Sequence, residues 1–306
     1  MIEVNNIVKT YNKGKVKALN GISFSVGKGE VLGLIGPDGA GKTSLFRILT
    51  TLLLPDSGEA QVNNFHVVTN FNDIRTCVGY MPGRFSLYLD LTVEENLHFF
   101  ATVFNTTIEE NYHLIKDIYE QLQPFKERKA GKLSGGMKQK LALCCALIHK
   151  PAVLFLDEPT TGVDVVSRKE FWQMLGRLKE QGLTILVSTP YMDEALLCDR
   201  IAFMHKGDIL SINTPKEILA SFHRELFAIK TTKTFQLLNA LRSLPDTYTC
   251  FAFGESIHWV PKIHTTPSAL QSIIQALDEN ATLEKINPTL EDCFIDLLNQ
   301  PNASSN

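Results

Sequence analysis

The sequence predicts an α/β core followed by a smaller α+β domain. Short, almost continuously apolar runs such as "EVLGLIG" and "AVLFLD" alternate with helical patterns through the first part of the chain, as in a sheet covered by helices. Beyond about residue 222 the order becomes strand, helix, two strands, helix, strand and a last helix, which is a split βαβ pattern. We therefore expect domains over 1–220 and 221–300 and a disordered tail over 301–306.

The strands of the first domain are expected where apolar residues alternate or run together. They are 2–11, 21–26, 30–36, a strand that follows turn residues at 56–64, 152–157, 183–189 and the two arms of a hairpin within 199–213. The helices are expected where apolar residues recur at helical spacing. They are 42–55, 96–104, 107–122, 135–151 and 167–179, with a capping box formed by Thr92 and Glu95 before the second of them.

The second domain is predicted in the same way from alternating and helical spacing. Its expected strands are 225–231, 247–253, 256–261 and 281–287, and its expected helices are 235–244, 268–279 and 289–300.

Composition narrows the class of protein. A net charge of −3 and a hydrophobic content of 44% are ordinary for a globular protein and give no electrostatic footprint for nucleic acid. No apolar run approaches the roughly 20 residues that cross a bilayer, and the N-terminal stretch "MIEVNNIVKTY" predicts no signal peptide. The six cysteines contain no CxxC pair, so we expect reduced thiols, a cytoplasmic compartment and no metal site built from cysteine or histidine.

The stretch "GPDGAGKT" matches the phosphate-binding pattern G-x-x-x-x-G-K-[ST] between a predicted strand and a predicted helix. Glycines let successive backbone N–H groups face a phosphate, and the helix N-terminus adds positive potential. Lys42 would reach the β- and γ-phosphates of a nucleotide, and the Thr43 hydroxyl would bind Mg²⁺. The residues predicted to bind nucleotide here are Gly36, Pro37, Asp38, Gly39, Ala40, Gly41, Lys42, Thr43 and Ser44.

A second motif, "VLFLDE", supplies two carboxylates at the end of a buried strand. Asp157 is predicted to hold Mg²⁺, as in other P-loop enzymes. Glu158, one residue further on, is placed to polarise an attacking water as a general base. Two solvated acids at a strand end are the ordinary alternative, and the P-loop upstream favours the catalytic interpretation.

The stretch "LSGGMKQK" resembles the signature motif of the ATP-binding subunits of ABC transporters, and the resemblance covers residues 1 to about 220. It implies a P-loop NTPase cassette with a mixed sheet and a helical subdomain at about 84–150. It also implies that Ser134, Gly135 and Gly136 grip the nucleotide held by an opposite subunit, because a helix N-terminus attracts phosphate. Two chains are then needed to close two sites.

Three further positions match the family more loosely. Tyr11 stands where the family stacks an aromatic ring on adenine, and Val16 would flank it, although an exposed tyrosine at a strand end is an alternative. Asp164, in "TTGVD", matches the loop that crosses between subunits.

Two positions depart from the family. In "GYMPGRFSLY", Gly83 stands where the family has a glutamine that touches Mg²⁺ and water. In "STPYMDEA", Pro190 stands where the family has a histidine that contacts the γ-phosphate. Glycine offers no side-chain oxygen, and proline offers neither a side-chain donor nor a backbone N–H. We therefore expect ATP binding to persist while hydrolysis at this site is slow, since one lost transition-state donor costs about 10²–10³ in rate.

The departures at Gly83 and Pro190 favour a heterodimer with a second ATPase subunit, and the intact Ser134–Gly136 would complete the site of that subunit. The alternative is a homodimer in which Ser188, Thr189 or Arg84 compensates. The segment "FSLYLDLTVEENLHFF" resembles the family's stretch beside the groove that receives a membrane permease, although core packing would also explain its aromatic residues.

The C-terminal region, ending in "NPTLEDCFIDLL", resembles the accessory domain of ABC-2 type exporters. The resemblance thus implies an ATPase of an exporter, attached to the inner face of the cell membrane through a separate permease. A nucleotide-binding regulatory subunit with little hydrolysis and a soluble ABC protein remain alternatives, and the transported substrate is not encoded in such a cassette.

Overall fold

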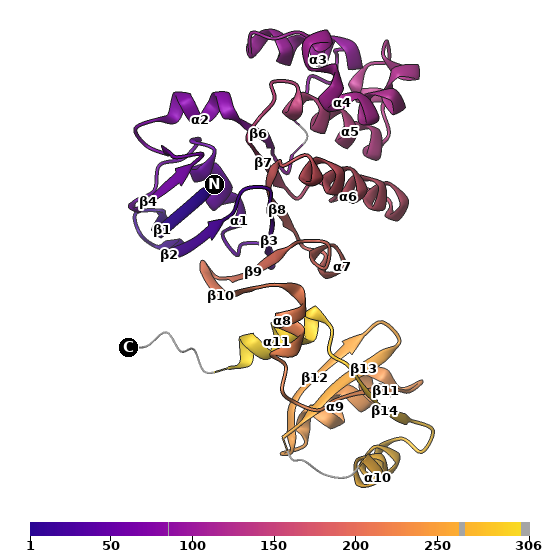
Figure 1. Ribbon diagram of the computed structural model, residues 1–306. Coiled ribbons are helices and arrows are strands. Elements are labelled where there is room, and N and C mark those ends of the chain that lie inside the picture. Colours follow the sequence, from indigo (N-terminus) through magenta and orange to yellow (C-terminus); the bar gives the residue numbers. More distant parts are fainter. Residues whose placement is uncertain (85, 263–266, 301–306) are drawn as a thin grey trace. The chain divides into compact units, whose positions relative to one another are not determined.

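The computed structural model describes residues 1–84, 86–262 and 267–300 (Figure 1). The chain divides into two compact units, Met1–Pro215 and Lys216–Asn306. Among the described residues, no helix combines the length and apolar character needed to span a membrane. The tail expected to be disordered, 301–306, lies outside the described residues.

The first unit contains an antiparallel sheet of four strands in the order β2-β1-β4-β5. The strands are β1 (Ile2–Tyr11), β2 (Val16–Val26), β4 (Ser57–Val62) and β5 (Phe65–His66). The strand predicted at 21–26 begins earlier than expected, at Val16, because residues 16–20 pair with the end of β1 although they show no apolar alternation of their own. This pairing sets Val16 directly opposite Tyr11.

A second sheet of six strands forms the centre of this unit, in the order β10-β9-β3-β8-β7-β6. Its strands are β3 (Val31–Ile35), β6 (Val78–Met81), β7 (Val153–Asp157), β8 (Thr184–Thr189), β9 (Arg200–His205) and β10 (Asp208–Asn213). Neighbouring strands from β6 to β9 run parallel, and β10 returns antiparallel as the predicted hairpin. Because β3, β7 and β8 are parallel neighbours, the residues that follow them meet at one edge of the sheet.

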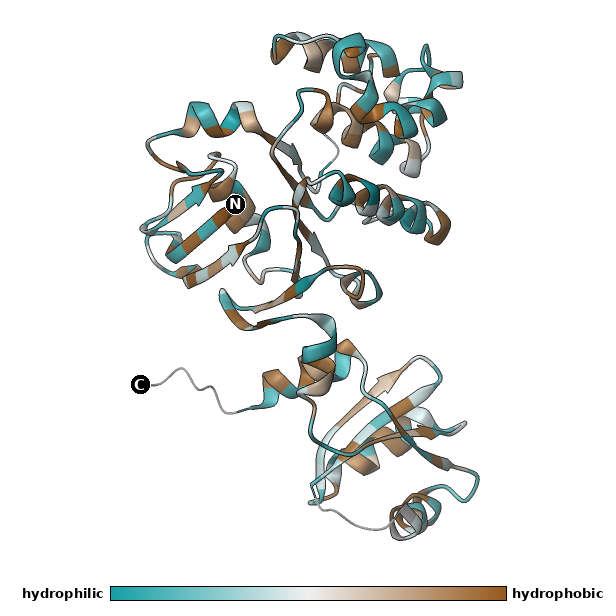
Figure 2. Cartoon of the chain, in the orientation of Figure 1, coloured by the Kyte–Doolittle hydropathy of each residue, from teal (hydrophilic) through white to brown (hydrophobic). Residues whose placement is uncertain are grey.

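Helices surround this sheet, and Figure 2 shows apolar residues concentrated in its central strands. The helices are α1 (Lys42–Leu49), α2 (Phe71–Cys77), α3 (Val93–Val103), α4 (Ile108–Leu122), α5 (Gly135–Leu147), α6 (Val165–Glu180) and α7 (Met192–Ala195). Two short 3₁₀ turns, Gln123–Phe125 and Ala130–Lys132, connect α4 to α5. The capping box of Thr92 and Glu95 is confirmed at the start of α3.

The helix predicted over 42–55 ends at Leu49, so its last turn and a half was wrong. Thr51 has a φ of 62°, a left-handed conformation that no helix continues. The backbone N–H groups of Leu52 and Leu53 both donate to the Arg47 carbonyl, which closes the helix end. The apolar run after Leu49 misled the prediction, because Leu52 and Leu54 are 58% and 64% exposed.

The second unit has the predicted order of strands and helices. After α8 (Pro215–Ala220) come β11 (Leu226–Lys230), α9 (Thr234–Ser243), β12 (Thr247–Phe253), β13 (Ser256–Pro261), α10 (Pro267–Leu277), β14 (Thr282–Ile286) and α11 (Leu290–Asn299). The four strands form an antiparallel sheet in the order β12-β13-β11-β14. Phe227, Leu241 and Trp259 lie in its core. A capping box of Thr289 and Asp292 begins α11.

Candidate nucleotide-binding site

The predicted phosphate loop lies between β3 and α1, and backbone from two other strands confines it. A Cβ atom on Gly36 would lie 2.1 Å from the Met204 carbonyl oxygen, and one on Gly41 would lie 2.4 Å from the Ala18 carbonyl oxygen. Gly41 also has a φ of 108°, which L side chains rarely adopt. Gly36 and Gly41 are therefore required by the packing of the loop itself.

Two backbone carbonyls of the loop hold the Lys42 side chain against it. Its side chain is 4% exposed, and Nζ donates to the Gly36 carbonyl at 2.7 Å and to the Pro37 carbonyl at 3.1 Å. The same Nζ lies 3.6 Å from Oε1 of Glu158. The ammonium group and the carboxylate predicted from two separate motifs are therefore neighbours.

Ser188, near the end of β8, contacts both acidic residues of the second motif. Its hydroxyl donates to Oδ1 of Asp157 at 2.8 Å and accepts the backbone N–H of Glu158 at 2.9 Å. Glu158 has a φ of 52°, an uncommon conformation for a residue with a side chain, and such strain is kept where the surroundings fix it. The sequence analysis did not assign this bridging role to Ser188, because the adjacency of β7 and β8 is a property of the sheet order.

The predicted Mg²⁺ ligands have the right chemistry for that ion. Mg²⁺ prefers hard oxygen donors and uses few protein ligands when it accompanies a nucleotide. Asp157 offers a carboxylate that is 3% exposed, and Thr43 offers an exposed hydroxyl on the first turn of α1. In the described part of the chain, no group of three or more His, Cys, Asp or Glu side chains could hold a metal ion alone. One carboxylate and one hydroxyl fit an ion that phosphates would help to coordinate.

Tyr11, Val16 and Ser44 come together beside the phosphate loop. Tyr11 is the cross-strand partner of Val16, and its hydroxyl lies 3.0 Å from Oγ of Ser44 on α1. Val16 is 48% exposed. Stacking of Tyr11 on an adenine ring stays a prediction.

The signature residues lie at the start of α5, as their motif predicts. Ser134 caps this helix, and its hydroxyl accepts the backbone N–H of Met137 at 3.3 Å. A Cβ on Gly136 would lie 2.6 Å from Oγ of Ser167. Asp164 caps α6 and accepts the backbone N–H of Ser167 at 3.0 Å, and the hydrogen bonds from Ser167 lower the pKa of Asp164. The signature and the predicted crossing loop are thus packed together.

The two departures from the family lie where the motifs place them. A Cβ on Gly83 would lie 3.1 Å from the carbonyl oxygen of Asp157, so this position faces the second motif. Pro190 is exposed and directly follows β8. Of the residues named as compensating groups, Ser188 is committed to Asp157 and Glu158, Thr189 donates to Glu194 at 2.5 Å, and Arg84 is exposed.

An apolar groove of about 500 Å³ lies between the helical layer and the central sheet of the first unit. Its apolar lining includes Leu52, Tyr80, Leu87, Phe100, Val103 and Phe104. His149 forms part of the wall, where its ring stacks on Phe104 with centroids 3.8 Å apart and its Nε2 lies 3.0 Å from the Val78 carbonyl. The sequence analysis placed a groove beside residues 85–100, of which Phe85 lies outside the described residues.

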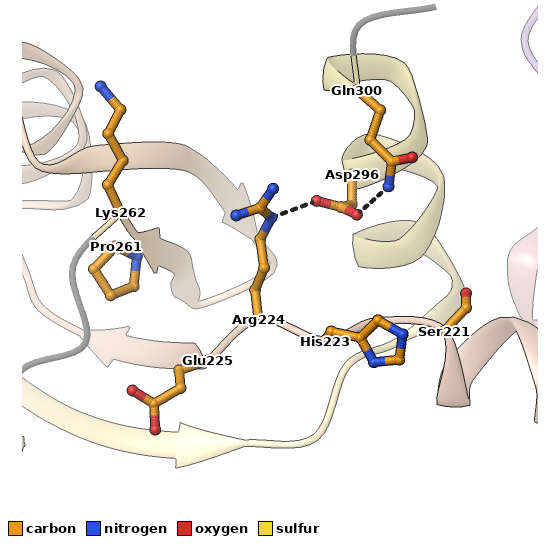
Figure 3. Close-up of a pocket in the computed structure, with 8 residues that line it drawn as sticks. All are labelled: Ser221, His223, Arg224, Glu225, Pro261, Lys262, Asp296 and Gln300. Atoms are coloured by element: carbon orange, nitrogen blue, oxygen red, sulfur yellow. Dashed lines mark hydrogen bonds and ion pairs between the residues drawn. The ribbon is translucent and has the colours of Figure 1, made fainter. Parts of the chain in front are cut away.

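A polar cavity of about 290 Å³ lies in the second unit (Figure 3). Nε of Arg224 lies 3.1 Å from Oδ1 of Asp296, whose other oxygen accepts Nε2 of Gln300 at 2.8 Å. The guanidinium also covers the ring of Tyr248 at 3.8 Å. This cavity contains none of the predicted nucleotide-binding residues.

Comparison with known proteins gives a consistent result. Residues 19–161 match the family described as ABC transporter. The chain is 38% identical to the probable multidrug ABC transporter ATP-binding protein YbhF of Escherichia coli over 97% of its length, but it spans only 52% of that protein. It is 31% identical to the linearmycin resistance ATP-binding protein LnrL of Bacillus subtilis over 97% of this chain and 98% of LnrL.

Among solved structures, the dimeric ATP-binding cassette MJ0796 bound to ADP and phosphate is 26% identical, with a TM-score of 0.63 over 70% of this chain and 98% of that one. The likeness confirms the predicted cassette fold of the first unit. Given this fold, the convergent motifs and the match to LnrL along nearly both full lengths, the chain belongs to the ABC transporter family, among its ATP-binding proteins.

Proposed function

We propose that this chain is the ATP-binding subunit of an ABC exporter, in which MgATP binding and hydrolysis drive transport through a separate permease. The observation that carries the proposal is the 3.6 Å approach of Lys42 Nζ to Glu158 Oε1 beside a phosphate loop in which packing requires glycine at positions 36 and 41. The names of YbhF and LnrL, a multidrug transporter protein and a linearmycin resistance protein, support export.

Each group in the site has a chemical task. The backbone N–H groups of the loop and Lys42 bind the phosphates, and Thr43 with Asp157 would hold Mg²⁺, which neutralises developing charge on the phosphates. Glu158 accepts a proton from the attacking water. Ser134, Gly135 and Gly136 close the site of the opposite subunit over its nucleotide, and the signature residues of that subunit close this one in return.

We expect slow hydrolysis at the site built on Lys42. Gly83 faces Asp157 but brings no oxygen, and Pro190 brings no donor to the end of β8. The hydroxyls of Ser188 and Thr189 are already engaged within the chain, which weakens the idea that they compensate. A heterodimer with a second ATPase subunit accounts for an intact signature beside a depleted hydrolytic site.

The apolar groove is the surface that we assign to the permease. Its wall includes Val103, which is 55% exposed, although a monomeric protein has little reason to leave such residues in a concave patch. A short apolar helix of a membrane subunit would cover it. In this proposal the chain lies on the cytoplasmic face of the cell membrane, held there by the permease, with the second unit as an accessory domain and with no nucleic acid partner.

The proposal is tested by measuring nucleotide binding and turnover separately. Equilibrium dialysis with labelled ATP should show binding by the wild-type chain and by Glu158→Gln, and a large loss for Lys42→Ala. Turnover by the chain alone should be slow and should rise when the second ATPase subunit is added. Brisk turnover by the lone wild-type chain, abolished by Glu158→Gln, would contradict the weak-site proposal and favour a homodimer.

Partners are identified by co-purification from detergent-solubilised membranes. We expect permeases together with a second ATPase subunit. Permeases alone would support the homodimer, and ribosomes would support a soluble ABC protein. A regulatory subunit, which Gly83 and Pro190 favour as the second candidate, would bind ATP and remain without turnover in every complex.

A further inference from the structure

The buried carboxylate of Glu194, to which no motif assigns a role, joins the segments at the ends of β7 and β8. Glu194, in α7, is 3% exposed, and its Oε2 accepts hydroxyl hydrogen bonds from Thr189 at 2.5 Å and from Thr160 at 2.9 Å. Thr189 is the last residue of β8, whereas Thr160 lies two residues after Glu158. Both threonines are at most 1% exposed, so the carboxylate is enclosed by its partners.

The second oxygen of this carboxylate faces a cation. Oε1 of Glu194 lies 3.7 Å from Nη1 of Arg168 and makes no hydrogen bond within the described chain. Arg168 belongs to α6, whose start is capped by Asp164, and its guanidinium also covers the Tyr191 ring at 4.2 Å. A buried charge is tolerated only when it is paired and hydrogen-bonded, so this set of partners must be kept together.

We propose that Glu194 is a positioning residue that couples the end of β8 to the loop formed by residues 160–164. Near the end of β8, the Ser188 hydroxyl donates to Asp157 of the candidate site. The 160–164 loop ends at Asp164, which caps α6 and is predicted to cross to the other subunit. A change at one subunit's Glu158 would thereby reach the interface with the other subunit.

This inference rests on the proposed function, and the experiment separates the two. Hydrogen–deuterium exchange is measured on the wild-type chain, Glu194→Ala and Asp193→Asn, each with and without MgATP. Asp193 is the matched control, because it lies on the same helix and contacts Arg168 at 3.4 Å but touches neither threonine. Protection of residues 36–49 by ATP reports the nucleotide site, and exchange of residues 160–164 reports the coupling through Glu194.

In the wild-type chain and in Asp193→Asn, we expect ATP to protect both segments. In Glu194→Ala, residues 36–49 should stay protected while amides 160–164 exchange about tenfold faster, the loss expected for one charge-assisted hydrogen bond. Thr160→Val should reproduce this effect, and combining it with Glu194→Ala should add little. Equal protection of 160–164 in all variants would overturn the inference, whereas failure of ATP to protect 36–49 in the wild-type chain would overturn the proposed function.

A second readout excludes a merely structural role. In complexes that turn over ATP, Glu194→Ala should lower kcat about tenfold and leave KM within about twofold, because it misplaces groups that act after binding. A loss of ATP binding in Glu194→Ala as large as its loss in kcat would contradict the positioning role. So would a fall in kcat for Asp193→Asn as large as that for Glu194→Ala.

Discussion

A side chain at position 83 would begin 3.1 Å from the carbonyl oxygen of Asp157 and 3.8 Å from its carboxylate carbon. The loop after β6 therefore still brings this position to the second motif, although glycine occupies it. The residues predicted to bind Mg²⁺ and to act in hydrolysis thus lie beside a position that offers no side-chain oxygen.

Restoring both groups should raise turnover. We expect Gly83→Gln combined with Pro190→His to increase ATP hydrolysis by the lone chain about tenfold or more, because each adds a polar group beside the reacting phosphate. Steady-state phosphate release measures this change. Gly83→Ala is the control, since it adds a Cβ without an oxygen and should not accelerate hydrolysis. A double variant that binds ATP normally but is no faster than wild type would contradict the explanation.

A charge in the apolar groove should release the permease without affecting the nucleotide. Val103→Asp places a carboxylate on the groove wall, where burial under a partner would cost several kcal/mol. We expect co-purification with the permease to be lost while ATP binding is unchanged. Leu54→Asp serves as the control, because Leu54 is 64% exposed and lies outside the groove lining. Equal co-purification of both variants would show that the permease docks elsewhere.

The phosphate loop should tolerate alanine at Gly39 and not at Gly36. Gly36→Ala would bring Cβ to 2.1 Å from the Met204 carbonyl oxygen, which belongs to a buried strand, so we expect a loss of about 3 kcal/mol or more in unfolding free energy. At Gly39 no atom lies within 4 Å, and the φ of 77° alone should cost about 1 kcal/mol. Urea denaturation of the two variants compares them, and equal losses would contradict the packing argument.

The free energy of unfolding of the first unit should decrease as the pH is lowered from neutral, because His149 is buried. Burial lowers the pKa of His149 from 6.5, outweighing the hydrogen bond to the Val78 carbonyl. The unfolded chain then binds more protons, so stability is complete above about pH 6.5 and is lost as the pH falls toward the lower folded pKa. Thermal unfolding between pH 5 and 8 should be flatter for His149→Gln than for wild type. His113→Gln, at an exposed position, should leave the wild-type slope unchanged.

Much of the fold was predictable because buried strands and amphipathic helices carry a strong apolar pattern. The sequence analysis missed β6 and α2, and for α2 the reason is physical: Ile74 is its single buried residue, so its seven residues carry no helical periodicity. The same limit explains β2, whose first half is held by pairing with β1 and carries no apolar pattern of its own.

The site was predictable only where chemistry is local in sequence. The phosphate loop, both carboxylates and the signature are contiguous motifs, and they lie where expected. The bridging role of Ser188 and a role for Glu194 were not assigned, because their partners belong to strands and loops that become neighbours only when β7 lies beside β8. The catalytic and metal-binding roles of the motif residues stay predictions that the variants above would test.

The loop around Lys42 is walled by main-chain oxygens, contributed by Ala18 on one flank and Met204 on the other. The wall itself does not depend on the side chains at those two positions, since any L-residue presents the same carbonyl, although the Met204 side chain is buried in the core. The register of β2 and β9, in contrast, is constrained. Deleting a single residue from β2 or β9 would shift the strand register by one residue and turn the carbonyl at that place toward the other neighbouring strand, so the loop would lose its wall although every residue of the motif is unchanged.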